Sequence, residues 1–201
     1  MKELPVPKEA VNLPAIIRMF MHPETGKHTV CIHHDKGLGH GPAFWGLVMA
    51  DLLTHVVQMM QIEEGSSPNL LAGQIFSMLG KNEHPICDAI DVIADDFVVT
   101  RASGEPFDEE REIIQIRYDD DLIILLEGMA LSAEIWSNVF SDLIESVVGM
   151  EMDSQDIEIS LEQVSVGCEQ VVEWMKKEWD KPTTDAKTLL VEEDEEESET
   201  E

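Results

Sequence analysis

The chain has 201 residues, 43% of them apolar, and a formal net charge of −29 at pH 7. Such a chain can bury one large core or two small ones. Because a strongly acidic field repels phosphate backbones and anionic lipid surfaces and speeds encounter with basic proteins, we expect a basic protein partner and neither nucleic acid nor membrane. The alternative explanation of the same charge is solubility alone.

The N-terminal part of the chain predicts a hairpin followed by two helices. Residues 1–14 contain three prolines and predict an extended lead-in. Two strands, Ala15–Met21 and His28–His34, flank a turn that contains Pro and Gly. Apolar residues at helical spacing over residues 44–59 predict a long helix. Residues 67–80 predict a second helix, which begins at Ser-Pro and ends at Gly.

The next segment, residues 86–111, is predicted to be an acidic connector. Its apolar residues from Ile86 to Phe97 lie on one face of a helix, with aspartates outside that face, so we expect a helix there. Residues 101–111 are polar and contain Gly and Pro, which is typical of a linker.

The same order of elements returns in the second part of the chain. Strands are predicted over Glu112–Tyr118 and Leu122–Leu126, followed by a helix over residues 135–150. A last helix begins at Ser160, where Gln163 completes the form of a capping box, and ends before Pro182.

The two long helices are similar in sequence at a constant offset of 91 residues. Within residues 44–59 and 135–150, seven of sixteen aligned pairs are identical, which indicates an internal duplication. The identical pairs are Trp45/Trp136, Val48/Val139, Asp51/Asp142, Leu52/Leu143, Val56/Val147, Val57/Val148 and Met59/Met150.

We therefore predict an α+β fold made of two β-β-α-α units in tandem. A two-stranded sheet is marginal alone, so we expect the two hairpins to join edge to edge about a pseudo-twofold axis, with the helices on one face. The predicted parts are a first unit (residues 1–85), the acidic connector (86–111), a second unit (112–184) and a disordered acidic tail (185–201).

The segment from Gly41 to Val56, with its Pro, Trp-Gly, Asp and His, resembles the hallmark of a small bacterial family, domain of unknown function 5076. The lead Lys2–Pro7 and the Glu-Trp…Pro-Thr element at residues 178–183 fit the same family. The resemblance covers residues 2–85 best and the second unit more loosely. It implies a fold and a bacterial origin, and it carries no assigned activity.

Six motif positions are candidate site residues whose role the sequence leaves open: Trp45, Gly46, Asp51, His55, Trp136 and Asp142. The two tryptophans could line a ligand pocket, although a repeated inward aromatic favours a core anchor. Asp51 and His55 lie one helical turn apart and could form an acid/base pair or a surface pair. The second unit has Ser146 in place of the histidine, which favours a structural role for the aspartate.

All seven histidines lie between His22 and His84, within the first unit. His33, His34 and His40, with Cys31 and Asp35 nearby, are the residue types that bind Zn²⁺. However, neighbouring residues of a strand point to opposite faces, and no HExxH spacing is present. We therefore assign no metal-binding, cofactor-binding or catalytic residue.

Cysteine content and hydropathy predict a cytoplasmic protein. The three cysteines, Cys31, Cys87 and Cys168, are scattered and odd in number, as expected of reduced thiols. The longest aliphatic run, Leu122–Leu126, is too short to span a membrane, and the N-terminus predicts no secretory signal.

Two function hypotheses follow. The first is a non-enzymatic binding or adaptor protein, because residues 86–201 carry 34 acidic side chains against 7 basic ones and no nucleophile–base arrangement can be assembled. The alternative is a small metal-dependent or acid/base enzyme or sensor that uses His33, His40 or His55 of the first unit.

Overall fold

The structure is a computed structural model. It describes residues 3–8, 10–22, 24–33, 40–79, 90–94, 97–101, 110–119, 121–127, 131–154, 160–179 and 186–191. Its helices are α1 (Gly41–Glu64), α2 (Pro68–Leu79), α3 (Ala133–Ser154) and α4 (Leu161–Glu178). Its strands are β1 (Ala15–Met21), β2 (His28–His33), β3 (Ile90–Ala94), β4 (Phe97–Arg101), β5 (Arg111–Asp119), β6 (Asp121–Glu127) and β7 (Ala186–Val191).

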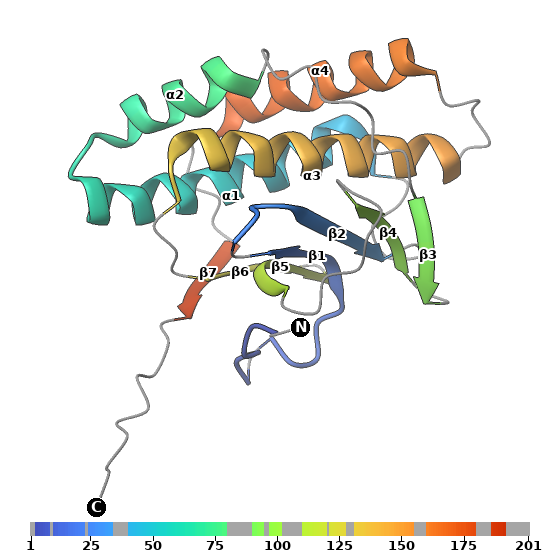
Figure 1. Cartoon of the computed structure of the whole chain (residues 1–201), viewed down its shortest axis with the longest axis horizontal. Helices are drawn as coiled ribbons and strands as arrows, with labels where there is room; N and C mark the ends of the chain where they lie inside the picture. Colours follow the sequence, from blue (N-terminus) through green and yellow to red (C-terminus); the bar gives the residue numbers. More distant parts are fainter. Residues whose placement is uncertain are drawn as a thin grey trace, which may run out of the picture.

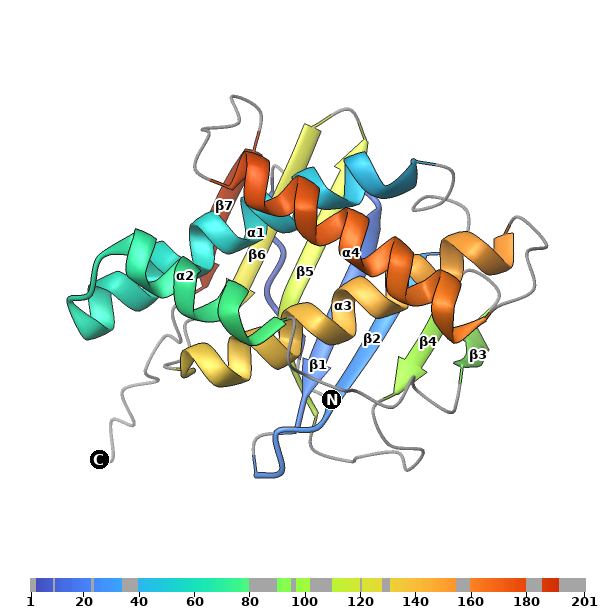
Figure 2. The same cartoon turned by 90° about the horizontal axis from the view of Figure 1, so that it is seen from above.

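The elements form one sheet covered by helices on a single face (Figure 1). α1 and α3 lie next to the sheet, and α2 and α4 lie over them as an outer layer. α4 packs along α1 and α2 packs along α3, as the view from above also shows (Figure 2). The N-terminal segment before β1 passes over the opposite face of the sheet, where Leu4 and Ala10 pack on Ile123 and Leu125.

The sheet has seven strands in the order β3-β4-β2-β1-β5-β6-β7. All neighbours are antiparallel except β6 and β7, which are parallel. The four strands predicted from the sequence occupy its centre, and β1 joins the hairpins by pairing with β5. The prediction of an α+β fold with an antiparallel sheet and helices on one face is therefore confirmed.

Two predictions for the rest of the chain are wrong. Within the described part of the connector, residues 90–94 and 97–101 form strands, where a helix was expected over residues 86–97. Residues 102–109 of the expected linker lie outside the described residues. Apolar residues three and four positions apart fit a helix, which explains the prediction. However, the run Phe97-Val98-Val99-Thr100 consists of good strand formers, and as β4 it pairs with the edge of β2. Residues 186–191 form β7 instead of belonging to a disordered tail, because β6 offers an edge to the aliphatic residues that precede the acidic run.

The ends of the helices follow their sequences. Pro42 lies in the first turn of α1, where its missing N–H has no intrahelical partner. Gly65 ends α1 with a left-handed conformation (φ 69°) and donates its N–H to the carbonyl of Gln61. The Ser160 hydroxyl accepts the N–H of Gln163 at 3.2 Å, which caps α4 as predicted.

Helix α1 is long and apolar enough to cross a membrane, the one such helix among the described residues. Two thirds of that stretch, 67%, is buried against the rest of the protein. A helix buried to this extent is typical of the core of a globular domain.

Candidate functional site

Trp45 is a buried anchor between α1 and α3. Its ring is 1% exposed, and its indole Nε1 donates a hydrogen bond to Oε1 of Glu151 at 2.9 Å. The backbone N–H of His40 reaches the same oxygen at 3.3 Å. Glu151 of α3 therefore holds the start of α1 with one carboxylate, and the indole is not available to line a ligand pocket.

Trp136 occupies the equivalent position without an equivalent partner. Its side chain is fully buried, and its Nε1 has no hydrogen-bond partner within the described part of the chain. At the 91-residue offset, Glu151 corresponds to Met60, which is buried but carries no carboxylate. A buried donor without a partner costs about 1–3 kcal/mol of stability. Burial of the Trp136 indole is therefore less favourable than burial of the Trp45 indole, although the two residues occupy equivalent positions in the sequence.

Gly46 lies where α1 touches α4. A Cβ built on Gly46 would stand 2.2 Å from Cβ of Trp174 and 3.1 Å from the carbonyl oxygen of Val171. The absence of a side chain therefore sets the distance between the two helices. Its counterpart Ser137 is buried on α3 and donates its hydroxyl to the carbonyl of Glu134 in the same helix, at 2.7 Å.

Asp51 and His55 lie one turn apart on α1, as expected. Asp51 is 6% exposed, and His55 is half-buried. Burial lowers the pKa of His55, which favours a neutral imidazole at pH 7. The pair thus belongs to the packed interior around α1.

Asp142 contacts a histidine of the other unit. Its Oδ2 lies 2.6 Å from Nδ1 of His28, which joins α3 to β2. His28 is 5% exposed, and its Nε2 has no hydrogen-bond partner among the described residues. His28 was not a candidate from the sequence, because its partner lies 114 residues away and a single histidine at a strand start carries no signal.

Glu145 lies one turn after Asp142 on α3. Burial, followed by the nearby charge of Asp142, raises the pKa of Glu145 from 4.5 to about 7. Burial of the Cys168 thiol, followed by the nearby charge of Glu145, raises the pKa of Cys168 to about 12. The Cys168 thiol is therefore protonated at neutral pH and unsuited to act as a nucleophile.

The raised pKa of Glu145 predicts a pH-dependent stability. Between about pH 4.5 and pH 7 the folded protein binds a proton that the unfolded chain has released, so this contribution is full below pH 4.5 and is lost as the pH rises through 7. Glu145→Gln should match the wild type near pH 4.5 and be more stable at pH 8 by about 1–2 kcal/mol, a value reduced for partial exposure. Urea unfolding at several pH values measures the difference. Glu173→Gln, a change of an exposed carboxylate on α4, should follow the wild type throughout.

The structure describes some of the candidate metal ligands, and these do not form a metal-binding group. His33 ends β2, and His40 stacks on Phe44 with ring centroids 4.1 Å apart. His34 and Asp35 lie outside the described residues. Among the residues that are described, no group of three or more His, Cys, Asp or Glu side chains could hold a metal ion.

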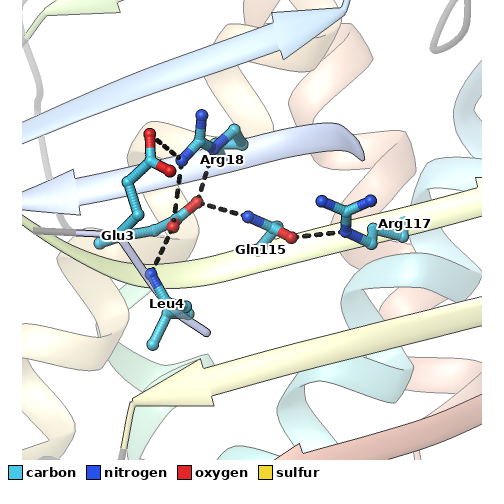
Figure 3. A network of polar contacts seen from close by, with 6 residues as sticks. Glu3, Leu4, Arg18, Gln115 and Arg117 are labelled. Atoms are coloured by element: carbon cyan, nitrogen blue, oxygen red, sulfur yellow. Dashed lines mark hydrogen bonds and ion pairs between the residues drawn. The ribbon is translucent and has the colours of Figure 1, made fainter. Parts of the chain in front are cut away.

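The face of the sheet opposite the helices carries a polar network that the sequence did not indicate (Figure 3). Glu112, with a fully buried side chain, accepts hydrogen bonds from Arg18 Nε at 2.7 Å and from the backbone N–H of Leu4 at 2.7 Å. Gln115 donates to Glu112 at 2.9 Å and accepts from Arg117 at 2.5 Å.

A β-bulge places Glu112 in this network. Met19 pairs with Ile114 and Phe20 pairs with Glu112, so Ile113 is an extra residue in β5. Because side chains alternate along a strand, the extra residue moves Glu112 to the face of Gln115. Together with Arg117, which donates to the carbonyls of Ala10 and Leu13, the network ties the N-terminal segment of the first unit to the central strand of the second.

No family model, curated protein or solved structure matches this chain. The resemblance to the domain of unknown function 5076 family therefore stays a prediction.

Proposed function

We propose that this chain is a non-enzymatic, cytoplasmic binding protein whose acidic surface engages a basic protein partner. The observation that carries the proposal is the charge of −29, of which residues 86–201 hold 34 acidic against 7 basic side chains. The candidate residues lend support, because Trp45, Gly46 and Asp142 each have a packing partner.

The helices α3 and α4 carry part of this charge. Five carboxylates on α3 and α4 are exposed, and the exposed basic residues of these helices are Lys176 and Lys177. The exposed carboxylates are Glu134, Asp153, Glu162, Glu169 and Glu173. Fixed negative charges at a helix surface raise the encounter rate with a cationic partner and are screened by salt.

We also propose that the chain is a duplicated unit of the 5076 type that forms an intramolecular pseudo-dimer. The antiparallel register of β1 with β5 supports this relation. Arg18 pairs with Gln115, and an apolar pair lies on each side of it, Ile17 with Ile116 and Met19 with Ile114. The packing of α1 on α4 and of α3 on α2 fits the same pseudo-twofold relation. A single-unit relative would obtain the same sheet by homodimerising.

The proposed function predicts salt-sensitive capture of a basic protein. Tagged full-length chain should retain a basic protein from native bacterial lysate at ~50 mM salt and release most of it by ~1 M salt, where the Debye length is about 3 Å. Deleting residues 192–201, eight of which are acidic, should weaken capture while β7 stays intact. Mass spectrometry identifies the captured protein. Retention that does not change with salt, or capture of no basic protein, would contradict the proposal.

A further inference from the structure

A shallow groove runs along one side of α4. Two depressions, of about 530 Å³ and about 340 Å³, open on this side, and Gln170 lines both. The larger lies against Pro42 and Ala43 at the start of α1, and the smaller lies against Met152 near the end of α3. Figure 2 shows both of these helix ends on the same side of α4. We call this surface, from Glu162 to Lys177 with Pro42, Ala43 and Met152, the α4 groove.

The α4 groove contains apolar side chains on either side of the exposed Gln170. Val166, in the middle of the outward side of α4, is 49% exposed, and the half-buried Trp174 lies two turns further on. Gly167 lets α4 lie close to α3, since a Cβ there would stand 2.6 Å from a methyl carbon of Val148. Exposed apolar side chains among polar ones on an outer helix are typical of a protein-binding surface.

The rim of the α4 groove is mostly acidic. Glu162 lines the smaller depression, Glu173 lines the larger one, and Glu169 is exposed on the same helix between them. Lys177 stands at one end, with its ammonium 4.0 Å from the ring centroid of Trp174. A ligand that fits this surface therefore needs apolar side chains in a row and cationic side chains beside them.

Charge argues against an occupant from this protein. The run at residues 192–201 is acidic at eight of ten positions, and a second copy of the chain brings a net charge of −29. Either would place carboxylates against Glu162, Glu169 and Glu173, and like charges across an interface repel. Charge complementarity therefore favours an occupant from another, basic protein.

We propose that the α4 groove binds a basic amphipathic helix of a partner protein. The distance from Glu162 to Lys177 along the helix axis is about 22 Å, enough for about four turns of a partner helix. Apolar residues of that helix, spaced three and four apart, contact Val166 and Trp174, and its lysines or arginines face the carboxylates of the rim. This inference rests on the proposed function, since it gives the acidic surface a specific site and a class of ligand.

Three fluorescent peptides of about four helical turns test the groove. The first is an amphipathic Leu/Lys helix, the second has the same composition in scrambled order, and the third keeps the Leu positions but replaces Lys with Glu. Binding is measured by fluorescence anisotropy with the full-length chain, with Val166→Gln and with Val11→Gln. Val11 is a matched control, because it is 58% exposed on the N-terminal segment, across the sheet from the helices.

We expect the amphipathic Leu/Lys peptide to bind roughly tenfold more tightly than the scrambled one. Val166→Gln should remove that advantage, and Val11→Gln should keep it. Equal binding of both basic peptides, unaffected by Val166→Gln, would overturn the groove and leave the proposed function standing. Binding of neither basic peptide would overturn both, and equally tight binding of the Leu/Glu peptide would overturn the charge requirement.

Discussion

Gly46→Ala should destabilise the protein by about 3 kcal/mol, because one methyl group forces α1 and α4 apart. The added Cβ would meet Cβ of Trp174 at 2.2 Å and the carbonyl of Val171 at 3.1 Å, and neither atom can rotate away. For a chain of about 200 residues this loss corresponds to a decrease in Tm of roughly 6–12 °C. Calorimetry or urea unfolding monitored by tryptophan fluorescence measures it.

The matched control is Gly149→Ala in α3. A Cβ at Gly149 meets nothing within 4 Å, so the same substitution adds no clash there. Alanine in a helix interior is favoured over glycine by about 0.5–1 kcal/mol, and we expect a small gain in stability. If both variants unfold at the same urea concentration, the contact at Gly46 does not set the distance between the helices.

Glu112→Ala should cost about 3–5 kcal/mol, the loss typical of removing one partner of a buried ion pair. The variant leaves the Arg18 guanidinium, whose side chain is 22% exposed, without its buried carboxylate, and it frees the N–H of Leu4. We expect the N-terminal segment to detach from the sheet before global unfolding. Hydrogen exchange should therefore rise at residues 3–13 as well as at β5.

Glu3→Ala is the control for this experiment. Glu3 pairs with the same guanidinium at 3.0 Å, but its side chain is 63% exposed. An exposed ion pair contributes at most about 1 kcal/mol, so Glu3→Ala should change stability little. Equal losses for the two variants would show that burial of Glu112 is not the source of the effect.

The sequence predicted the central fold because its signals are local. The strand Ala15–Met21 has the predicted bounds, and the repeated helix pattern gave α1 and α3. β3 was missed because the twelve residues 86–97 have apolar side chains three and four apart, which fit a helix as well as a strand, and the predicted helix ended at Phe97, where β4 begins. Only the edge of β2, a tertiary feature, decides between them.

The partners of the motif residues could not be predicted, because they come from the opposite unit. The repeat identified Trp45 and Trp136 as inward residues, but Glu151 becomes a partner only when α3 lies beside α1. One signal was available: extending the aligned helices by one position places Glu151 opposite Met60, a carboxylate where the other unit has an apolar residue. His28 and Asp142 offer no such sign.

The pairing of β1 with β5 has a consequence for folding during synthesis. Arg18 of β1 can pair with Gln115 of β5 only after the ribosome has added 97 further residues. Helix α1 is covered only when α4 has been synthesised. At typical rates of translation the chain needs roughly 6–23 s to extend from the end of α1 to the end of α4. Contacts this distant in sequence also slow folding itself. A nascent chain that stalls before β5 leaves the edge of β1 unpaired and the apolar face of α1 uncovered, and such truncated chains should aggregate unless a chaperone holds them.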